Sequence, residues 1–202
     1  MIIVFDLDGT LIDSSERMYR LFQRLIPESK LSKDEYWELK RNSINHQMIL
    51  EKYFPSYDYD EFNAKWLDMI ERDELLCLDK NYTDTLDILT NIKQRYDLFL
   101  LTARQSKDNL MRELKRLELF DFFNQILTTE AKSSKESLLV NSGLLGKGKD
   151  WFVSDMGKDI IVGTKCGFKT IGITHGFMCE EKLKDYNPSF LIKELYQLMD
   201  IV

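Results

Sequence analysis

The stretch Met1-Ile2-Ile3-Val4-Phe5-Asp6-Leu7-Asp8-Gly9-Thr10 decides the fold of this chain. Its apolar residues run together without polar alternation, which is typical of a strand buried on both faces of a parallel sheet. Gly9 indicates a turn directly after the strand. Ligands of open α/β sheets bind beyond the carboxyl ends of the strands, so Asp6 and Asp8 are expected together at the mouth of a site. Two carboxylates that close repel each other, and a hard cation such as Mg²⁺ is the usual remedy.

The rest of the chain alternates between strand and helix patterns. Further strands are predicted over 98–102, 125–128, 151–155 and 170–173. Helices are predicted over 83–94, 106–117, 134–141, 159–165 and 191–199. This alternation indicates an α/β fold with a doubly wound, Rossmann-like parallel sheet of about five strands.

Residues 15–80 interrupt the alternation. Asp6 and Thr102 stand 96 positions apart (102 − 6), whereas a crossover between parallel strands needs only about a dozen residues. We therefore predict a core domain, 1–14 and 81–202, and an inserted all-helical cap domain, 15–80, above the site. A helical decoration unrelated to catalysis is the alternative. The cap patterns predict no strand; they include a helix start with a capping box at Ser32 and Glu35 and helices over 44–53 and 60–76.

The bulk composition limits the classes of function. The net charge is −6, whereas a general nucleic-acid binder would carry a basic footprint, so no nucleic-acid partner is expected. No apolar segment is long enough for a membrane span, so no membrane partner is expected either. Three cysteines without CxxC spacing are interpreted as free thiols in a reducing cytoplasm. The chain has only two histidines, too few to favour a catalytic triad based on histidine or a zinc site. We expect a cytoplasmic monomer or homodimer.

Two further positions suit a phosphate site. Thr102 ends a predicted strand, and its hydroxyl, together with neighbouring backbone such as that of Ala103, could bind a phosphoryl oxygen. Lys135 follows a plausible N-cap, Ser134, in the first turn of a helix, where a cation opposes the helix dipole. A residue placed against local preference suggests a function. The alternatives are a structural threonine and a solvated lysine, and Lys132 is the competing lysine.

Asp155 and Asp159 follow the predicted strand 151–155. An acidic residue at a strand end, with a second one four positions later, suits the inner and outer layers of a Mg²⁺ site. The alternatives are a turn aspartate for Asp155 and a helix N-cap for Asp159.

In this order, the motifs resemble those of the haloacid dehalogenase-like (HAD) phosphohydrolases. The resemblance covers residues 1–14 and roughly 83–177, and the cap matches only by position and helical content. Two departures stand out: Glu136 follows the lysine where proline is frequent, and Ser154 replaces a usual glycine. The matching positions are Asp6 to Ser14 for the first motif, Thr102 for the second, Lys135 for the third, Asp155 with Asp159 for the fourth, and 166–177 for the phosphoglycolate phosphatase-like branch.

The resemblance implies a Mg²⁺-dependent phosphatase that acts on a small phosphorylated metabolite through an aspartyl-phosphate. Asp6 would be the nucleophile, and Asp8 would protonate the leaving oxygen and then activate water. Asp6, Asp155 and Asp8, the last through its backbone carbonyl, would bind Mg²⁺, with Asp159 behind them. Thr102, Ala103 and Lys135 would hold the phosphoryl group.

Three other functions are compatible with parts of this pattern. A sugar-phosphate mutase or phosphotransferase would use the same aspartyl-phosphate beneath a cap that excludes water. A dehalogenase is disfavoured because the related metal-free branch does not use the acid–base aspartate, which is present here as Asp8. A non-catalytic receiver-like module that binds phosphate or Mg²⁺ would share the acids, threonine and lysine, but it would lack the helical insertion.

Overall fold

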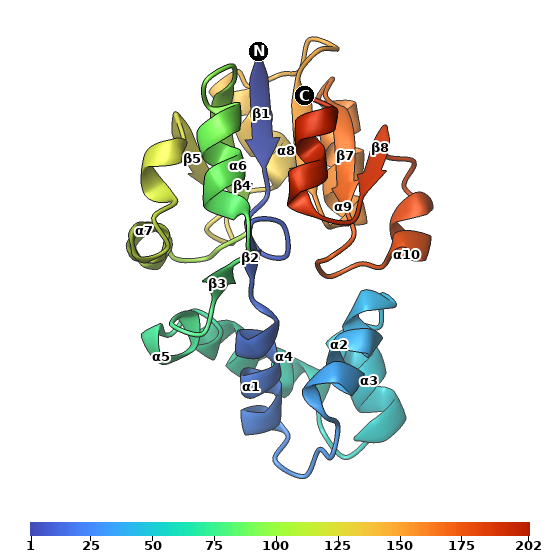
Figure 1. The fold of residues 1–202 in the computed structure, drawn as a ribbon. Coiled ribbons are helices and arrows are strands. Elements are labelled where there is room, and N and C mark those ends of the chain that lie inside the picture. Colours follow the sequence, from blue (N-terminus) through green and yellow to red (C-terminus); the bar gives the residue numbers. More distant parts are fainter.

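The strand at the start of the chain lies in the middle of a six-stranded sheet. A computed structural model describes residues 1–202 and gives the strand order β5-β4-β1-β6-β7-β8, with every neighbouring pair parallel (Figure 1). This confirms the predicted α/β Rossmann-like class. The strands are β1 (Ile2–Phe5), β4 (Asp97–Thr102), β5 (Gln125–Thr128), β6 (Trp151–Ser154), β7 (Lys169–Ile173) and β8 (Phe190–Ile192).

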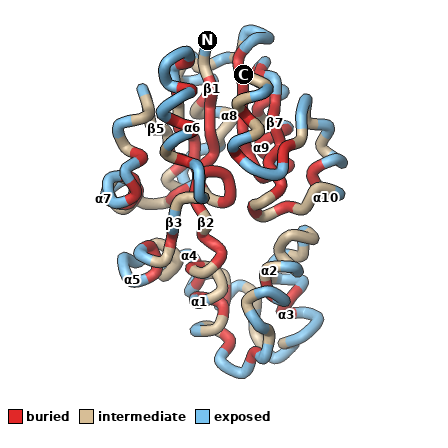
Figure 2. Tube along the Cα trace, viewed as in Figure 1, coloured by how far each residue is buried: buried red, intermediate tan, exposed pale blue.

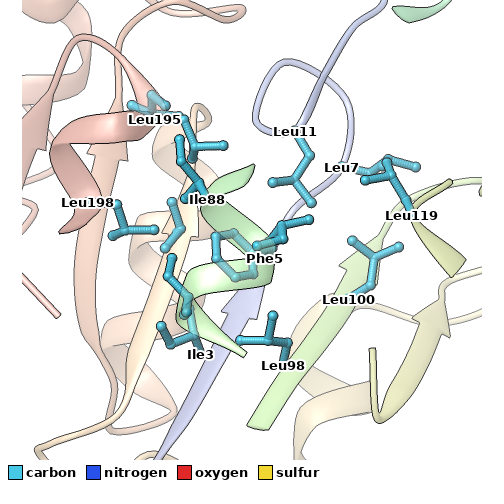
Figure 3. Close-up of a cluster of buried hydrophobic side chains, with 14 of the residues drawn as sticks. Ile3, Phe5, Leu7, Leu11, Ile88, Leu98, Leu100, Leu119, Leu195 and Leu198 are labelled. Atoms are coloured by element: carbon cyan, nitrogen blue, oxygen red, sulfur yellow. The ribbon is translucent and has the colours of Figure 1, made fainter. Parts of the chain in front are cut away.

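Helices cover both faces of this sheet. On β1, Ile3 and Phe5 join a cluster of 22 buried apolar residues on one face, whereas Val4 between them joins the cluster on the other face. Figure 3 shows the larger cluster, in which Ile88 and Leu198 pack toward Phe5. The first face is covered by α6 (Thr85–Ile92), α7 (Lys107–Arg116) and the 3₁₀ helix η2 (Leu195–Asp200), and the second by α8 (Lys135–Ser142) and α9 (Gly157–Lys165).

Five helices form a smaller unit beyond the carboxyl ends of the strands. They are α1 (Ser15–Leu25), α2 (Lys33–Arg41), α3 (His46–Tyr53), α4 (Tyr59–Met69) and α5 (Asp73–Leu76). They have a buried cluster of their own, nine residues around Phe22 and Tyr36, visible as red segments inside this unit in Figure 2. The predicted capping box of α2 is present, with Ser32 accepting from the Glu35 amide. The exact division into core and cap domains stays a prediction.

Two short strands join the helical unit to the sheet. β2 (Ile12–Asp13) and β3 (Lys80–Asn81) pair in an antiparallel ribbon where the chain leaves and re-enters the core. Sequence patterns missed this ribbon because two residues are too few to show any periodicity. The chain therefore crosses between the two units through two adjacent, hydrogen-bonded segments.

Three expectations about individual elements, one of them an alternative interpretation, were wrong. The helix predicted over 191–199 is replaced by β8, which pairs with β7, and by η2 after it, so the sheet has six strands instead of about five. The predicted helix 60–76 breaks after Met69, where the Ile70 carbonyl accepts a hydrogen bond from Arg17. The predicted N-cap role of Asp159 is also wrong, because α9 begins at Gly157.

The remaining elements are α10 (Glu180–Lys184) and the 3₁₀ helix η1 (Phe120–Phe122). None of the helices combines the length and the apolar character that crossing a membrane would require.

Candidate active site

Asp6 lies directly beyond the end of β1 and is held by a lysine from another element. Its backbone amide continues the ladder to β6 by donating to the Val153 carbonyl at 3.0 Å. The Lys135 ammonium lies 2.7 Å from Asp6 Oδ1 and 2.5 Å from Asp159 Oδ2. Ser154 donates to the same Asp159 oxygen at 2.9 Å. Lys135 thus joins the first and fourth motifs in one buried ion-paired group.

The position of Lys135 follows from the start of α8. Ser134 is the N-cap and accepts from the Ser137 amide at 3.0 Å, so Lys135 is the first helical residue. The competing Lys132 is exposed, and the structure does not bring it to Asp6. Burial lowers the pKa of Lys135, but the charges of Asp6 and Asp159 outweigh burial and hold the pKa above its usual value. Lys135 is therefore a permanent cation in the site.

Asp155 is fully buried and directly follows β6, the strand that pairs with β1. Its Oδ1 accepts from the Thr10 hydroxyl at 3.1 Å, and its Oδ2 accepts from the Phe177 amide at 2.6 Å. A side chain on Gly9 or Gly176 would come within 2.1 or 2.2 Å of Asp155 Oδ2. Gly9 and Gly176 thus leave room around Asp155 Oδ2, and any larger residue at either position would collide with this oxygen.

The donor set suits a hard divalent cation. Burial raises the pKa of Asp6 to about 7, with Lys135 opposing this shift, and burial together with the charge of Asp6 raises the pKa of Asp155 well above its usual value. Such raised pKa values mean that the chain alone does not neutralise both carboxylates, and a bound cation would. No three His, Cys, Asp or Glu side chains converge in one metal-binding cluster. The side chains of Asp6 and Asp155 are therefore the candidate ligands, with the Asp8 carbonyl.

The carboxylate of Asp8 faces two buried arginines. Arg104 contacts it through Nε at 2.7 Å and through Nη2 at 3.0 Å, and Arg17 donates to the same carboxylate through Nη2. Although burial raises the pKa of Asp8, the charges of Arg104 and Arg17 together lower it to about 2. In this structure Asp8 is therefore a carboxylate that is paired away from Asp6.

The two arginines continue into a larger buried network. Arg17 Nε lies 3.0 Å from Asp79 Oδ1, and Arg104 Nη2 lies 3.1 Å from Asp79 Oδ2 and 2.9 Å from Glu113 Oε2. Sequence reasoning missed all four residues that form this network with Asp8, namely Arg17, Asp79, Arg104 and Glu113. The only local signal was Arg104, a charged residue two positions after the buried strand end at Thr102.

The charge of this network depends on Glu113. Two buried arginines face three acids, so the buried groups carry one excess carboxylate charge when all of them are ionised; the half-exposed Arg116 lies 3.7 Å from Glu113 Oε1. Burial raises the pKa of Glu113 to about 8; Arg104 opposes this shift and the neighbouring Asp79 reinforces it. Burial also raises the pKa of Asp79. We infer that Glu113 and Asp79 share a proton near neutral pH.

Replacing Glu113 by glutamine should therefore stabilise the protein increasingly as the pH rises. An acid whose pKa is raised from 4.5 to about 8 by folding stabilises the folded state below pH 4.5, and this stabilisation is lost as the pH rises through 8. Glutamine mimics the protonated acid and cannot lose the proton. Urea unfolding of both proteins between pH 5 and pH 9, spanning that interval, is the measurement. Parallel stability curves for the two proteins would contradict the shared proton.

Thr102 and Ala103 lie at the carboxyl end of β4. Thr102 is 1% exposed, whereas Ala103 is exposed, and both line the same cleft as Asp6. The Thr102 carbonyl accepts from the Thr129 amide at 3.1 Å, which ties β4 to the end of β5. Six of the predicted site residues thus line one cleft, and their roles stay predictions: Asp6, Asp8, Thr102, Ala103, Lys135 and Asp159.

A cleft of about 830 Å³ separates the sheet from the helical unit. Its floor carries the acidic residues and Lys135, and its opposite wall is formed by the end of α2 and the start of α3. The cleft lining includes Asp6, Asp8, Met18, Lys40, Ser43, Ile44, Asn45, Thr102, Ala103, Lys135, Lys158, Asp159 and Phe177.

Two contacts hold the helical unit over this cleft. On one side Arg41 donates to the carbonyls of Gly176 and Thr174 at 2.8 and 2.9 Å, and Trp37 packs on Phe177 with ring centroids 4.9 Å apart. On the other side the Glu71 carboxylate accepts from two amides at the start of α7. A carboxylate at a helix N-terminus is favourable. The helical unit is therefore attached to the core on both sides of the cleft.

The fold and the site define a class of α/β enzymes with a carboxylate cluster at the carboxyl edge of a parallel sheet. The sequence model of the haloacid dehalogenase-like hydrolases matches residues 3–173, and the chain belongs to this family of hydrolases. This confirms the resemblance drawn from the motifs.

Individual relatives extend over almost the whole chain. Pyrophosphatase PpaX of Bacillus pumilus is 27% identical over 218 residues, which cover 99% of this chain and 95% of the relative. A haloacid dehalogenase-like hydrolase from Streptococcus pneumoniae superposes with a TM-score of 0.80 at 18% identity, covering 99% of this chain and 97% of that one. A predicted phosphoglycolate phosphatase from Haemophilus somnus gives a TM-score of 0.78 at 18% identity, covering 99% and 96%.

Proposed function

We propose that this hydrolase is a Mg²⁺-dependent phosphatase that transfers a phosphoryl group to Asp6 and then to water. The observation that carries the proposal is the state of the Asp6 carboxylate. Lys135 holds its Oδ1 at 2.7 Å, and no hydrogen bond within the chain engages its Oδ2. A buried carboxylate with one oxygen fixed and the other free is oriented for in-line attack on phosphorus.

The surrounding residues would stabilise the transferring group. Lys135 supplies a fixed positive charge beside the nucleophile, and Thr102 with the backbone of Ala103 supplies donors at the same edge of the sheet. Mg²⁺ held by Asp6, Asp155 and the Asp8 carbonyl would neutralise charge on the phosphoryl oxygens. Asp159 and Ser154 would act indirectly: Asp159 holds the Lys135 ammonium, and Ser154 donates a hydrogen bond to Asp159.

The pairing of Asp8 bears on the leaving group. A carboxylate held by Arg17 and Arg104 can accept a proton from water, but it must leave an arginine to carry a proton to a leaving oxygen. A leaving group that departs as a stable anion needs this proton least. The Bacillus pumilus relative is a pyrophosphatase, whose leaving group is phosphate. We therefore propose inorganic pyrophosphate, beside small phosphomonoesters, as the first substrate to test.

Phosphate release should require a divalent cation. We expect turnover of at least one member of a panel of pyrophosphate and small phosphomonoesters, complete loss of that turnover in EDTA, and recovery on addition of Mg²⁺, because Asp6 and Asp155 are not neutralised otherwise. Turnover that persists in EDTA would contradict the metal requirement. Isomerisation of a sugar phosphate without phosphate release would favour the mutase alternative, and Mg²⁺ binding without any turnover would favour a receiver-like module.

A further inference from the structure

Two lysines of the cleft, Lys40 and Lys158, have no partner in the chain, and of these only Lys40 is partly buried. Every carboxylate that lines the cleft has a partner elsewhere: Asp6 and Asp159 bind Lys135, and Asp8 binds the two arginines. The Lys40 ammonium makes no ion pair or hydrogen bond within the chain, although the side chain is partly buried against the cleft wall. A partly buried charge without a partner is costly unless a ligand supplies one.

Two neutral aromatic residues, His46 and Tyr36, belong to the surroundings of Lys40. Burial lowers the pKa of His46 well below its usual value, and the nearby charge of Lys40 lowers it further. His46 Nε2 in turn lies 2.8 Å from the Tyr36 hydroxyl. Burial lowers the pKa of Lys40 itself to about 8. An anion bound beside Lys40 would stabilise its charge, and no acid of the chain pairs with Lys40 on this side of the cleft.

The adjacent residue fixes Lys40 in place. Arg41 binds the Thr174 and Gly176 carbonyls on the core side, and its own carbonyl accepts from the Cys179 amide at 3.0 Å. The last turn of α2 is therefore attached to the core, which places Lys40 on the wall opposite the Asp6–Lys135 floor. Lys135 is bound to two aspartates, and Lys158 is an exposed residue of the core helix α9. Lys40 is therefore the unpaired cation that the helical unit contributes to the cleft, where it can bind the part of the substrate that is not transferred.

We propose that Lys40 binds an anionic group on the leaving-group side of the substrate, so that the hydrolase selects phosphoryl compounds whose leaving group is itself negatively charged. This inference rests on the proposed phosphatase function and adds the substrate class to it. The chemistry fits a second phosphate, as in pyrophosphate, or a carboxylate, as in phosphoglycolate. It disfavours a neutral or cationic leaving group such as that of phosphoethanolamine.

Binding to an inactive protein tests the inference separately from turnover. In the Asp6→Asn background, calorimetric titration with pyrophosphate, phosphoglycolate and phosphoethanolamine measures affinity when Mg²⁺ is present but no reaction occurs. Adding Lys40→Gln should weaken the binding of pyrophosphate or phosphoglycolate by about tenfold to a hundredfold, the usual effect of losing a charged hydrogen bond. The affinity for phosphoethanolamine should change by less than about threefold, because its ammonium gains nothing from Lys40. The relative size of the two losses distinguishes a phosphate from a carboxylate as the natural anion.

Two further variants serve as controls. Lys40→Arg keeps the charge and should retain most of the affinity, whereas Lys30→Gln removes an exposed lysine of the helical unit outside the cleft and should leave all three affinities unchanged. An equal loss for all three compounds, or no loss for the two anionic ones, would overturn the role of Lys40. If the wild type releases phosphate from no compound while the selective loss persists, the proposed function fails but the anion site stands.

Discussion

Asp6→Asn should lower phosphate release by a factor on the order of a thousand or more, with little change in substrate affinity. The carboxamide has the same shape as the carboxylate, and its oxygen can still accept from Lys135 at the position where Oδ1 lies 2.7 Å from the ammonium. It cannot, however, attack phosphorus, because the amide nitrogen carries no available lone pair and the oxygen bears no charge. The substitution should therefore lower kcat and leave KM nearly unchanged.

A second readout tests the covalent step directly. Wild-type protein quenched in acid during turnover should carry a phosphoryl group on the peptide that contains Asp6, and Asp6→Asn should carry none. Asp97→Asn is a matched control, since Asp97 is an exposed aspartate at the opposite end of the sheet. Turnover of Asp6→Asn within tenfold of the wild type, or a phosphorylated residue elsewhere, would rule out Asp6 as the nucleophile.

The elements that sequence patterns predicted well are those whose signals are local. A continuous apolar run identifies a strand buried on both faces, and β1, β4 and β6 follow that rule. The polar residues at strand ends were equally readable, because the order of a parallel sheet brings all carboxyl ends to one edge. β8 escaped notice because three residues depend on pairing with β7 for their conformation.

The arginine network is the part of the site that no local pattern could reveal. Arg17 and Asp79 are 62 positions apart, and Arg104 and Asp8 are 96 positions apart. Arg17 stands in the polar run Ser14-Ser15-Glu16-Arg17, where it resembles any exposed helix residue. Only the ribbon β2–β3 brings the two ends of the insertion together and buries these charges. The strand alternation that was expected to pair Asp8 with Asp6 also stops at Phe5, where β1 ends.

Arg104→Met should lower the free energy of unfolding by about 3–5 kcal/mol, because removing one partner of a buried ionic group leaves uncompensated charges. Arg104 is 4% exposed, and Asp79 and Glu113 are as well shielded. Methionine has a similar length and keeps much of the packing, so the loss reports on charge more than on volume. Urea unfolding followed by circular dichroism measures it.

The matched control comes from α7, the helix that follows Arg104 in the chain. Arg112 on α7 pairs with Asp73 at 2.9 Å, but the two side chains are 59% and 77% exposed. Arg112→Gln should therefore cost no more than about 1 kcal/mol. Equal effects of the two substitutions would contradict the assignment of Arg104 to a buried network.

The pH dependence separates lost charge from lost packing. Without Arg104 the pKa of Glu113 should rise above its wild-type value of about 8, since the charge of Arg104 opposes the effect of burial. Below pH 8 Glu113 keeps its proton in the folded state of both proteins, so their stabilities fall in parallel; above pH 8 only Arg104→Met continues to lose stability, and its deficit relative to wild type should grow there. A deficit that does not change with pH would indicate that packing alone was lost. Because Arg17 and Asp79 flank the two crossings of the chain, a growing deficit would also mean that the charge state of this network stabilises the junction between the helical unit and the core.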